Sequence, residues 1–397
     1  MVVSYFEIDI GERIKMISRF SKRWTLGLMM LALVIVLWVL SSFMINLIFE
    51  DGSYRKPFFI TYINTAAFTF YLLPTSKAIL KNYWRTGQWN IHDQLRIQEE
   101  GSGSGEVGSP LIPKSDSSDD GERLSLYETI KLSAEFCILW FSANFVTNAS
   151  LSYTSVASQT ILSSTSSFFT LFVGALCRVE KISKVKVIGS MVSFFGILLV
   201  TRSDSKPTHI KPLPGSRDIL DQNNDAFKTL IGNILALLGA LLYGVYSTLL
   251  KRKVKDESRV NMKVFFGFVG LFTLIFLWPS MILLHYMGWE TFELPSTSRV
   301  IAIVVANCLI TFISDFCWAN AMLLTSPLTV TVGLSVTIPF AMFGDFILKH
   351  KPMTLLYLLG AILILGSFFI INKSSEEENL ENLIEDADRD INDRITA

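Results

Sequence analysis

Residues 162–168 read Leu-Ser-Ser-Thr-Ser-Ser-Phe, and residues 334–340 read Leu-Ser-Val-Thr-Ile-Pro-Phe. They belong to a longer correspondence in which residues 148–168 map onto residues 320–340, at an offset of about 172 positions. Three earlier pairs share an offset of about 205 positions: Gly27 and Gly232, Trp38 and Tyr243, and Pro74 and Pro279. The second half of the chain therefore repeats the first.

The composition indicates a protein that lies in a membrane. Half of the residues are hydrophobic and 18% are charged, whereas about 25% of the residues in soluble domains are charged. A helix needs about 20 apolar residues to span a bilayer. Segments that reach or approach this length lie at about 25–49, 57–80, 128–149, 154–177, 185–201, 228–250, 262–284, 300–322, 327–348 and 353–372. We therefore expect an all-α membrane protein with ten transmembrane helices.

The repeat and the spans together predict the domain organisation. Each half holds five spans, and because an odd number of spans turns the chain over, the two halves must be inverted repeats. Such repeats are typical of secondary transporters. The expected regions are an N-terminal tail at 1–24, a first five-helix repeat at 25–201 with a disordered loop at 85–123, a polar linker at 202–227, a second five-helix repeat at 228–372 and an acidic tail at 373–397.

The distribution of lysine and arginine predicts the orientation. Segments on the side of the N-terminus hold about twice as many basic residues as segments on the opposite side. Short cytosolic segments of membrane proteins are enriched in lysine and arginine. We therefore expect both termini and the loop at 85–123 to be cytosolic.

Several classes of chemistry have no counterpart in the sequence. The four histidines and four cysteines do not form the paired spacings of a metal site, and no glycine-rich phosphate loop is present. The formal net charge is +0, which gives no indication of a nucleic-acid partner. We therefore expect neither an enzyme nor a protein with a bound cofactor or metal.

Charged residues within spans are candidates for function because they are costly in lipid. Asp315 lies near the middle of the eighth span, and no basic residue lies within five positions of it. It either faces a cavity or pairs with another helix. Glu135 lies four residues after Lys131 in the third span. It either forms a local ion pair with Lys131 or lines the cytosolic entrance.

Neutral polar and aromatic residues complete the candidate site. Side-chain amides in lipid need partners, and either hydrogen bonds between helices or contacts to cargo would provide them. The candidates are Asn144, Asn148, Gln159, Asn307 and Asn320. Trp38 and Tyr243 either pack in the core or stack on a planar cation.

A family likeness lies in three segments: residues 137–144 (Cys-Ile-Leu-Trp-Phe-Ser-Ala-Asn), 158–170 and 326–335. Together with the plan of spans and repeats, they resemble the drug/metabolite transporter superfamily, and within it the F subfamily of solute carrier family 35. The likeness extends over about residues 23–375 and is greatest to a group of fungal vacuolar membrane proteins with a thiamine-repressible relative. It implies EamA-type repeats, alternating access and a vacuolar membrane, with the Golgi or mitochondrial membrane as alternatives.

These observations predict a secondary active transporter of a small polar or cationic metabolite across an endomembrane. Coupling to protons through Asp315 or Glu135 is a further hypothesis. The expected partners are the small-molecule cargo and the lipid bilayer, and a homodimer is a hypothesis. The alternative is a scaffold or nutrient sensor that transports nothing and acts through its cytosolic loop and tail.

Overall fold

The structure is a computed structural model. It describes residues 2–50, 54, 56–74, 76–77, 81, 84, 124–150, 153, 156–204, 219–255, 259–349 and 354–396. The expected loop at 85–123 lies outside the described residues, as do residues 205–218 of the expected linker.

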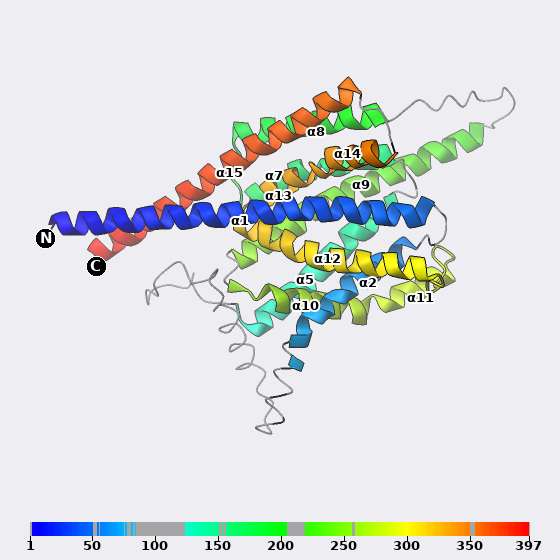
Figure 1. Ribbon diagram of the computed structural model, residues 1–397, viewed down its shortest axis with the longest axis horizontal. Helices are drawn as coiled ribbons and strands as arrows, with labels where there is room; N and C mark the ends of the chain where they lie inside the picture. Colours follow the sequence, from blue (N-terminus) through cyan, green and yellow to red (C-terminus); the bar gives the residue numbers. More distant parts are fainter. Residues whose placement is uncertain are drawn as a thin grey trace.

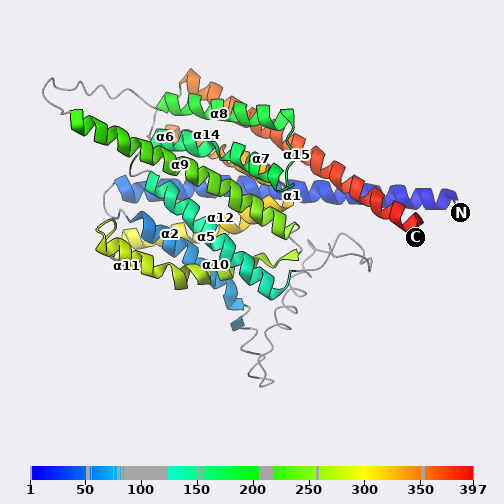
Figure 2. The same cartoon turned by 180° about the vertical axis from the view of Figure 1, so that it is seen from behind.

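The described residues form helices and no strand, which confirms the all-α class (Figures 1 and 2). The helices are α1 (Val2–Glu50), α2 (Pro57–Ala66), the 3₁₀ helix η1 (Ala67–Leu72), α5 (Leu126–Ser150), α6 (Val156–Ser164), α7 (Ser166–Leu176), α8 (Lys184–Asp204), α9 (Ile219–Val254), α10 (Met262–Phe276), α11 (Trp278–Tyr286), α12 (Ser298–Leu324), α13 (Pro327–Leu334), α14 (Thr337–Lys349) and α15 (Leu355–Thr396). They pack side by side in one bundle.

Six helices in the described part of the chain are long and apolar enough to cross a membrane. They are Met16–Met44, Lys184–Arg202, Leu230–Val254, Met262–Tyr286, Ser298–Leu324 and Leu355–Glu385, and two shorter apolar helices are Phe58–Leu72 and Pro327–Ala341. The chain is therefore a multi-pass membrane protein. The count of ten spans and the inversion of the repeats stay predictions.

The fourth and ninth expected spans are each divided into two helices, and the divisions fall at corresponding positions of the repeat. α6 gives way to α7 at Thr165, whose Oγ1 donates to the carbonyl of Leu162 at 2.5 Å. α13 gives way to α14 just before Thr337, whose Oγ1 donates to the carbonyl of Leu334 at 2.6 Å. Such back-bonding from threonine competes with the backbone ladder of a helix. The same local sequence thus produces the same break in both halves.

Three expected boundaries differ from the structure. The N-terminal tail at 1–24 belongs to α1, and the acidic tail at 373–397 continues α15 as far as Thr396. α9 begins at Ile219, inside the expected linker at 202–227. Pairs spaced four residues apart, such as Arg389 with Glu385 at 3.6 Å, support helix in the acidic segment. Figure 1 shows the outer ends of α1 and α15 on one side of the bundle, here called the termini side.

The packing of the bundle pairs helices that are distant in sequence. α1 packs against α12, α5 against α9, α8 against α15, and α10 against η1. The core between them is rich in aromatic rings, including Phe136, Phe265, Phe266 and Trp318, none of which is exposed. α12 thereby reaches the centre of the bundle, and it carries Asp315 there.

Candidate functional site

Asp315 is buried at the centre of the bundle, with 3% of its surface exposed. The indole of Trp38 on α1 donates from Nε1 to Ser314 Oγ at 3.2 Å, and it also lies within hydrogen-bond reach of the Asp315 carboxyl. Among the residues that the structure describes, no lysine, arginine or histidine pairs with this carboxyl. The predicted absence of a local partner thus extends to the surrounding described helices.

Aromatic side chains enclose the carboxyl. The Tyr71 ring stacks on Phe312 with centroids 3.8 Å apart, and its hydroxyl donates to the Phe312 carbonyl at 2.6 Å. On the other flank, Trp318 Nε1 donates to the hydroxyl of Tyr243 at 3.3 Å, and Tyr246 packs against both rings. This shell excludes water, so an ionised carboxylate inside it costs several kcal/mol unless a cation or a proton accompanies it.

A second polar contact joins α1 to α12. Asn307 is 1% exposed, and its Oδ1 accepts a hydrogen bond from Ser41 Oγ at 2.5 Å. Asn307 and Ser314 are seven residues apart, so they lie on one face of α12. Together with Trp38, these residues form a polar line between the two helices that passes Asp315. Ser41 and Ser314 had no sequence signal beyond being small hydroxyl residues.

The other predicted amides are satisfied within their own helices. Asn144 and Asn320 each donate from Nδ2 to the carbonyl four residues earlier, at 2.8 and 2.7 Å. Gln159 donates from Nε2 to Ser163 Oγ at 3.0 Å. The side chain of Asn148 lies outside the described residues. The hydrogen bonds of Asn144, Gln159 and Asn320 stay within their own helices, and the choice between bonding to another helix and contact with cargo stays a prediction.

Glu135 lies apart from this cluster. Its carboxylate accepts from Lys253 Nζ of α9 at 2.6 Å, and 36% of its side chain is exposed. Of the two alternatives, the structure does not show the local pair with Lys131 among the described residues, because the packing of α5 against α9 brings Lys253 closer. Of the predicted residues, the structure brings Trp38, Asn307 and Asp315 together, with Tyr243 behind Trp318.

Hydrogen bonds join separate segments of the chain at both ends of the bundle. On the termini side, Lys251 Nζ donates to the carbonyls of Leu323 and Thr325, the latter at 2.9 Å, where α12 ends. Carbonyls at a helix end lack intrahelical partners, so this lysine ties α9 to the end of α12. The sequence marks Lys251 only as one of several basic residues after a span.

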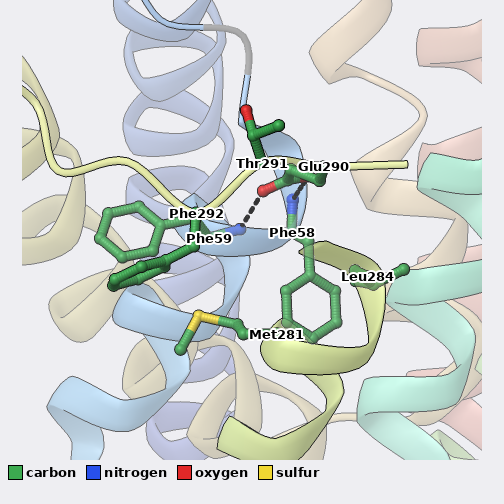
Figure 3. Close-up of a pocket in the computed structure, with 7 residues that line it drawn as sticks. All are labelled: Phe58, Phe59, Met281, Leu284, Glu290, Thr291 and Phe292. Atoms are coloured by element: carbon green, nitrogen blue, oxygen red, sulfur yellow. Dashed lines mark hydrogen bonds between the residues drawn. The ribbon is translucent and has the colours of Figure 1, made fainter. Parts of the chain in front are cut away.

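On the opposite side, a carboxylate binds the start of α2 (Figure 3). Glu290 accepts from the backbone N–H of Phe58 and of Phe59, each at 2.9 Å. Helix N-termini favour such anions. Beside it, the Tyr54 hydroxyl donates to the Glu293 carbonyl at 2.6 Å, and Lys56 pairs with the Glu293 carboxylate at 3.6 Å. Burial, with the charges of Glu290 and Glu293, raises the pKa of Tyr54 to about 12.

This cluster joins the loop after the first expected span to the loop after the seventh. A small pocket lies within it, lined by Phe58, Phe59, Met281, Leu284, Glu290, Thr291 and Phe292. Glu290 had no recognisable signal in the sequence, because a single glutamate in a loop shows no spacing pattern. At each end of the bundle, hydrogen bonds therefore join segments that are distant in sequence.

Comparison with known proteins identifies the family. A family model described as "Solute carrier family 35" matches residues 134–373. A second model, described as "Protein of unknown function (DUF3955)", matches residues 23–81. A solved crystal structure superposes with a TM-score of 0.57 over 90% of this chain and 98% of that chain, at 13% identity. That last likeness concerns the fold alone.

Named relatives agree with this family. The uncharacterized vacuolar membrane protein YML018C of Saccharomyces cerevisiae is 66% identical, over 92% of this chain and 95% of its own. The thiamine-repressible mitochondrial transport protein THI74 of the same yeast is 41% identical, over 88% and 92%. Solute carrier family 35 member F5 of Bos taurus is 31% identical, over 88% and 77%.

Several predictions from the sequence are confirmed by these relatives. The chain is a membrane transporter and not an enzyme, as the family and the named transport proteins indicate. The expected vacuolar membrane agrees with the relative that is 66% identical. The resemblance drawn from residues 137–144, 158–170 and 326–335 is confirmed, and the chain belongs to solute carrier family 35, in its F group.

Proposed function

We propose that the chain moves a small cationic or otherwise polar metabolite across an endomembrane by alternating access, and that Asp315 exchanges a proton for the cargo. The observation that carries this proposal is the buried Asp315 carboxyl, which has no basic partner among the described residues. A site that is enclosed and negatively charged is stabilised by a proton or by a cation, but not by both at once. Competition between the proton and the cargo for one carboxyl would couple the movement of the proton to the movement of the cargo.

The aromatic shell favours a cationic cargo over a neutral one. Five aromatic side chains belong to this shell: Trp38, Tyr71, Tyr243, Tyr246 and Trp318. The face of an aromatic ring attracts a cation, by about 2 kcal/mol when water is excluded. Entry of the cargo past Tyr243, Tyr246 and Trp318 requires these three rings to separate, because they pack directly against one another.

The packing supports ten spans in two inverted repeats. In the expected repeat, the first span (α1) corresponds to the sixth (α9), and the third span (α5) corresponds to the eighth (α12). The observed pair α1 with α12 then becomes the observed pair α9 with α5. The pairs α8 with α15 and η1 with α10 map onto themselves. Rocking of such repeats about a central site is the usual basis of alternating access.

The contacts at the two ends support the same mechanism. Glu290 joins the loop before α12 to α2, and Lys253 joins α9 to Glu135 of α5, so each contact links the two expected repeats. Opening of the bundle toward one side requires the contacts on that side to break while the contacts on the opposite side are kept. With the basic segments on the termini side, we place both termini in the cytosol. The vacuolar membrane follows the relative of that name.

Uptake into proteoliposomes tests the proposal. Radiolabelled thiamine and choline serve as an aromatic and an aliphatic cation, glucose serves as a neutral control, and a pH gradient is imposed. We expect uptake of at least one cation that is driven by the gradient, and its loss in Asp315→Asn. Cation uptake that is equal in this variant at every pH would exclude the exchange.

The scaffold or sensor alternative makes a different prediction. Its segments would be the loop at 85–123, which lies outside the described residues, and the acidic segment at 373–397. Membership of a transporter family weighs against it. Failure of every cation and every neutral solute to enter, with folded protein present, would favour this alternative.

A further inference from the structure

A buried ionic cluster lies where α15 leaves the apolar part of the bundle. Lys186 in the first turn of α8 has no exposed side-chain surface. Its Nζ donates to Glu180 Oε2 at 2.6 Å and to Glu378 Oε2 at 2.5 Å. The side chains of the two glutamates are 1% and 14% exposed. One ammonium group therefore contacts two carboxylates and balances the charge of only one of them, so the remaining negative charge needs further hydrogen-bond donors.

Backbone groups from two other segments supply these donors. Glu180 Oε1 accepts from the N–H of Leu328, in the first turn of α13, at 3.2 Å. Glu378 Oε1 accepts from the N–H of Lys181 at 2.9 Å. The positive end of the α13 dipole thus faces Glu180. The cluster joins the loop between α7 and α8, the start of α13, and α15.

The part of α15 that carries Glu378 is not needed to span a membrane. About 20 residues suffice for a span, and α15 has 42. Its apolar part ends near Asn372, and Figure 1 shows the helix continuing past the bundle on the termini side. Asn382, one turn beyond Glu378, accepts from Lys181 Nζ at 2.7 Å, so the contact continues along this extension.

We propose that the extension of α15 is a latch that positions α13 and closes the entrance on the termini side. This rests on the proposed alternating access, in which α13, the first half of the divided ninth span, must move. Glu180 and Lys186 are positioning residues, and Glu378 is the part of the latch that the extension supplies.

Charge balance explains the coupling. If α13 moves away, Glu180 loses the N–H of Leu328 and stays buried beside a second carboxylate. That arrangement is costly because buried carboxylates need donors. Release of Glu378 leaves Lys186 and Glu180 as a neutral pair that no longer depends on α13. Movement of the extension and movement of α13 are therefore linked by the same ammonium group.

Reactivity of a buried reporter cysteine tests the latch without any cargo. Thr329 lies in the first turn of α13 and is 0% exposed. Thr329→Cys is placed in a full-length chain whose four native cysteines are replaced by alanine, and the protein is held in nanodiscs. We expect Glu378→Gln to raise the rate of labelling by a polar maleimide at least fivefold.

The matched control lies one position away on the same helix. Glu377 is exposed and pairs with Lys373 at 3.9 Å, so Glu377→Gln should leave the rate within twofold. Asn382→Ala removes the outer contact but keeps the buried cluster, and we expect a smaller increase. An unchanged rate in Glu378→Gln, or an equal increase in Glu377→Gln, would overturn the latch. If Glu378→Gln does not fold, an unchanged rate in Asn382→Ala overturns it.

The outcomes separate the latch from the proposed function. If the labelling rate is unchanged in Glu378→Gln, the latch is excluded, and the proposed cation exchange at Asp315 is unaffected. If no cation is taken up but Glu378→Gln raises the labelling rate, the proposed cation exchange is excluded. The result would still support a gate that opens on the termini side.

Discussion

Gly196 of α8 and Gly360 of α15 face each other where the two helices cross. A Cβ on Gly196 would lie 2.9 Å from the carbonyl oxygen of Gly360, and a Cβ on Gly360 would lie 2.7 Å from that of Gly196. Small residues allow this approach of helix backbones in membranes. The fifth and tenth expected spans are thereby held together, and the crossing fixes the direction in which α15 leaves the bundle.

Substitution of Gly360 should therefore separate the two helices. We expect Gly360→Leu to lower the free energy of unfolding by about 1–3 kcal/mol, because backbone atoms cannot yield to the added side chain. Gly366 is the matched control on the same helix, since a Cβ there meets nothing within 4 Å. Thermal unfolding in detergent measures both variants, and an equal loss in Gly366→Leu would contradict the close crossing.

The hydrogen bond between Ser41 and Asn307 should couple α1 to α12. In a double-mutant cycle of Ser41→Ala and Asn307→Ala, we expect a coupling energy of about 0.6 kcal/mol, the average for such bonds in membranes. Ser42 is the matched control, because its hydroxyl donates to a carbonyl of its own helix. The cycle of Ser42→Ala with Asn307→Ala should be additive within error. Coupling of equal size in both cycles would contradict a specific bond.

The carboxylate of Glu290 should protect the start of α2 from solvent exchange. Phe58 and Phe59 donate to different oxygens of the carboxylate, and a glutamine replaces one of these oxygens with an NH2 donor that faces an N–H group. We expect Glu290→Gln to speed hydrogen exchange in peptides that contain Phe58 and Phe59, measured by mass spectrometry. Glu293→Gln is the control, since its side chain is 71% exposed. Unchanged exchange in Glu290→Gln would show that the carboxylate does not hold this helix start.

The all-α class and the candidates Trp38, Asn307 and Asp315 were accessible from the sequence, but the contacts between distant segments were not. Asp315 was identifiable because a lone carboxylate in an apolar span has no local explanation. Thr165 and Thr337 were identifiable as a pair because the repeat preserves them. Glu180 and Glu290 were missed, since each accepts from backbone N–H groups of a remote helix start, in addition to the Lys186 partner of Glu180. Periodicity and spacing describe one helix at a time, and they carry no information on such pairs.

The helix in the acidic segment illustrates the same limit. Composition marks 373–397 as an acidic tail and leaves open whether it is disordered or loosely helical. The segment is helical because α15 begins in the apolar core and Glu378 fastens the next turns to Lys186. The cost of starting a helix is already met by the span, so each added residue needs only a small further stabilisation. The sequence shows the charges of this segment, but it does not show that Glu378 pairs with Lys186.

Glu135 and Asp315 should differ in their effect on transport. The pair of Glu135 with Lys253 is half exposed, and exposed pairs contribute about 0.2–1 kcal/mol. We expect Glu135→Gln to retain transport driven by a proton gradient, in proteoliposomes that contain equal amounts of protein. Loss of gradient-driven uptake in Glu135→Gln, with Asp315→Asn unaffected, would move the coupling role to Glu135.

The buried carboxyl of Asp315 should also lower the stability of the protein. Asparagine has the same shape and carries no charge, so Asp315→Asn removes the cost of burying an ionised group without leaving a cavity. We expect this variant to unfold at a higher temperature than the wild type, with a gain of about 1–3 kcal/mol at neutral pH. Asn307→Ala is the opposite control, because it leaves Ser41 without its acceptor and should be destabilised. A lower unfolding temperature in Asp315→Asn would mean that the carboxylate has a stabilising partner in the closed state. The carboxyl would then be structural. A higher unfolding temperature would instead mean that the carboxyl is kept at a cost to stability, which the proposed binding of cargo would explain.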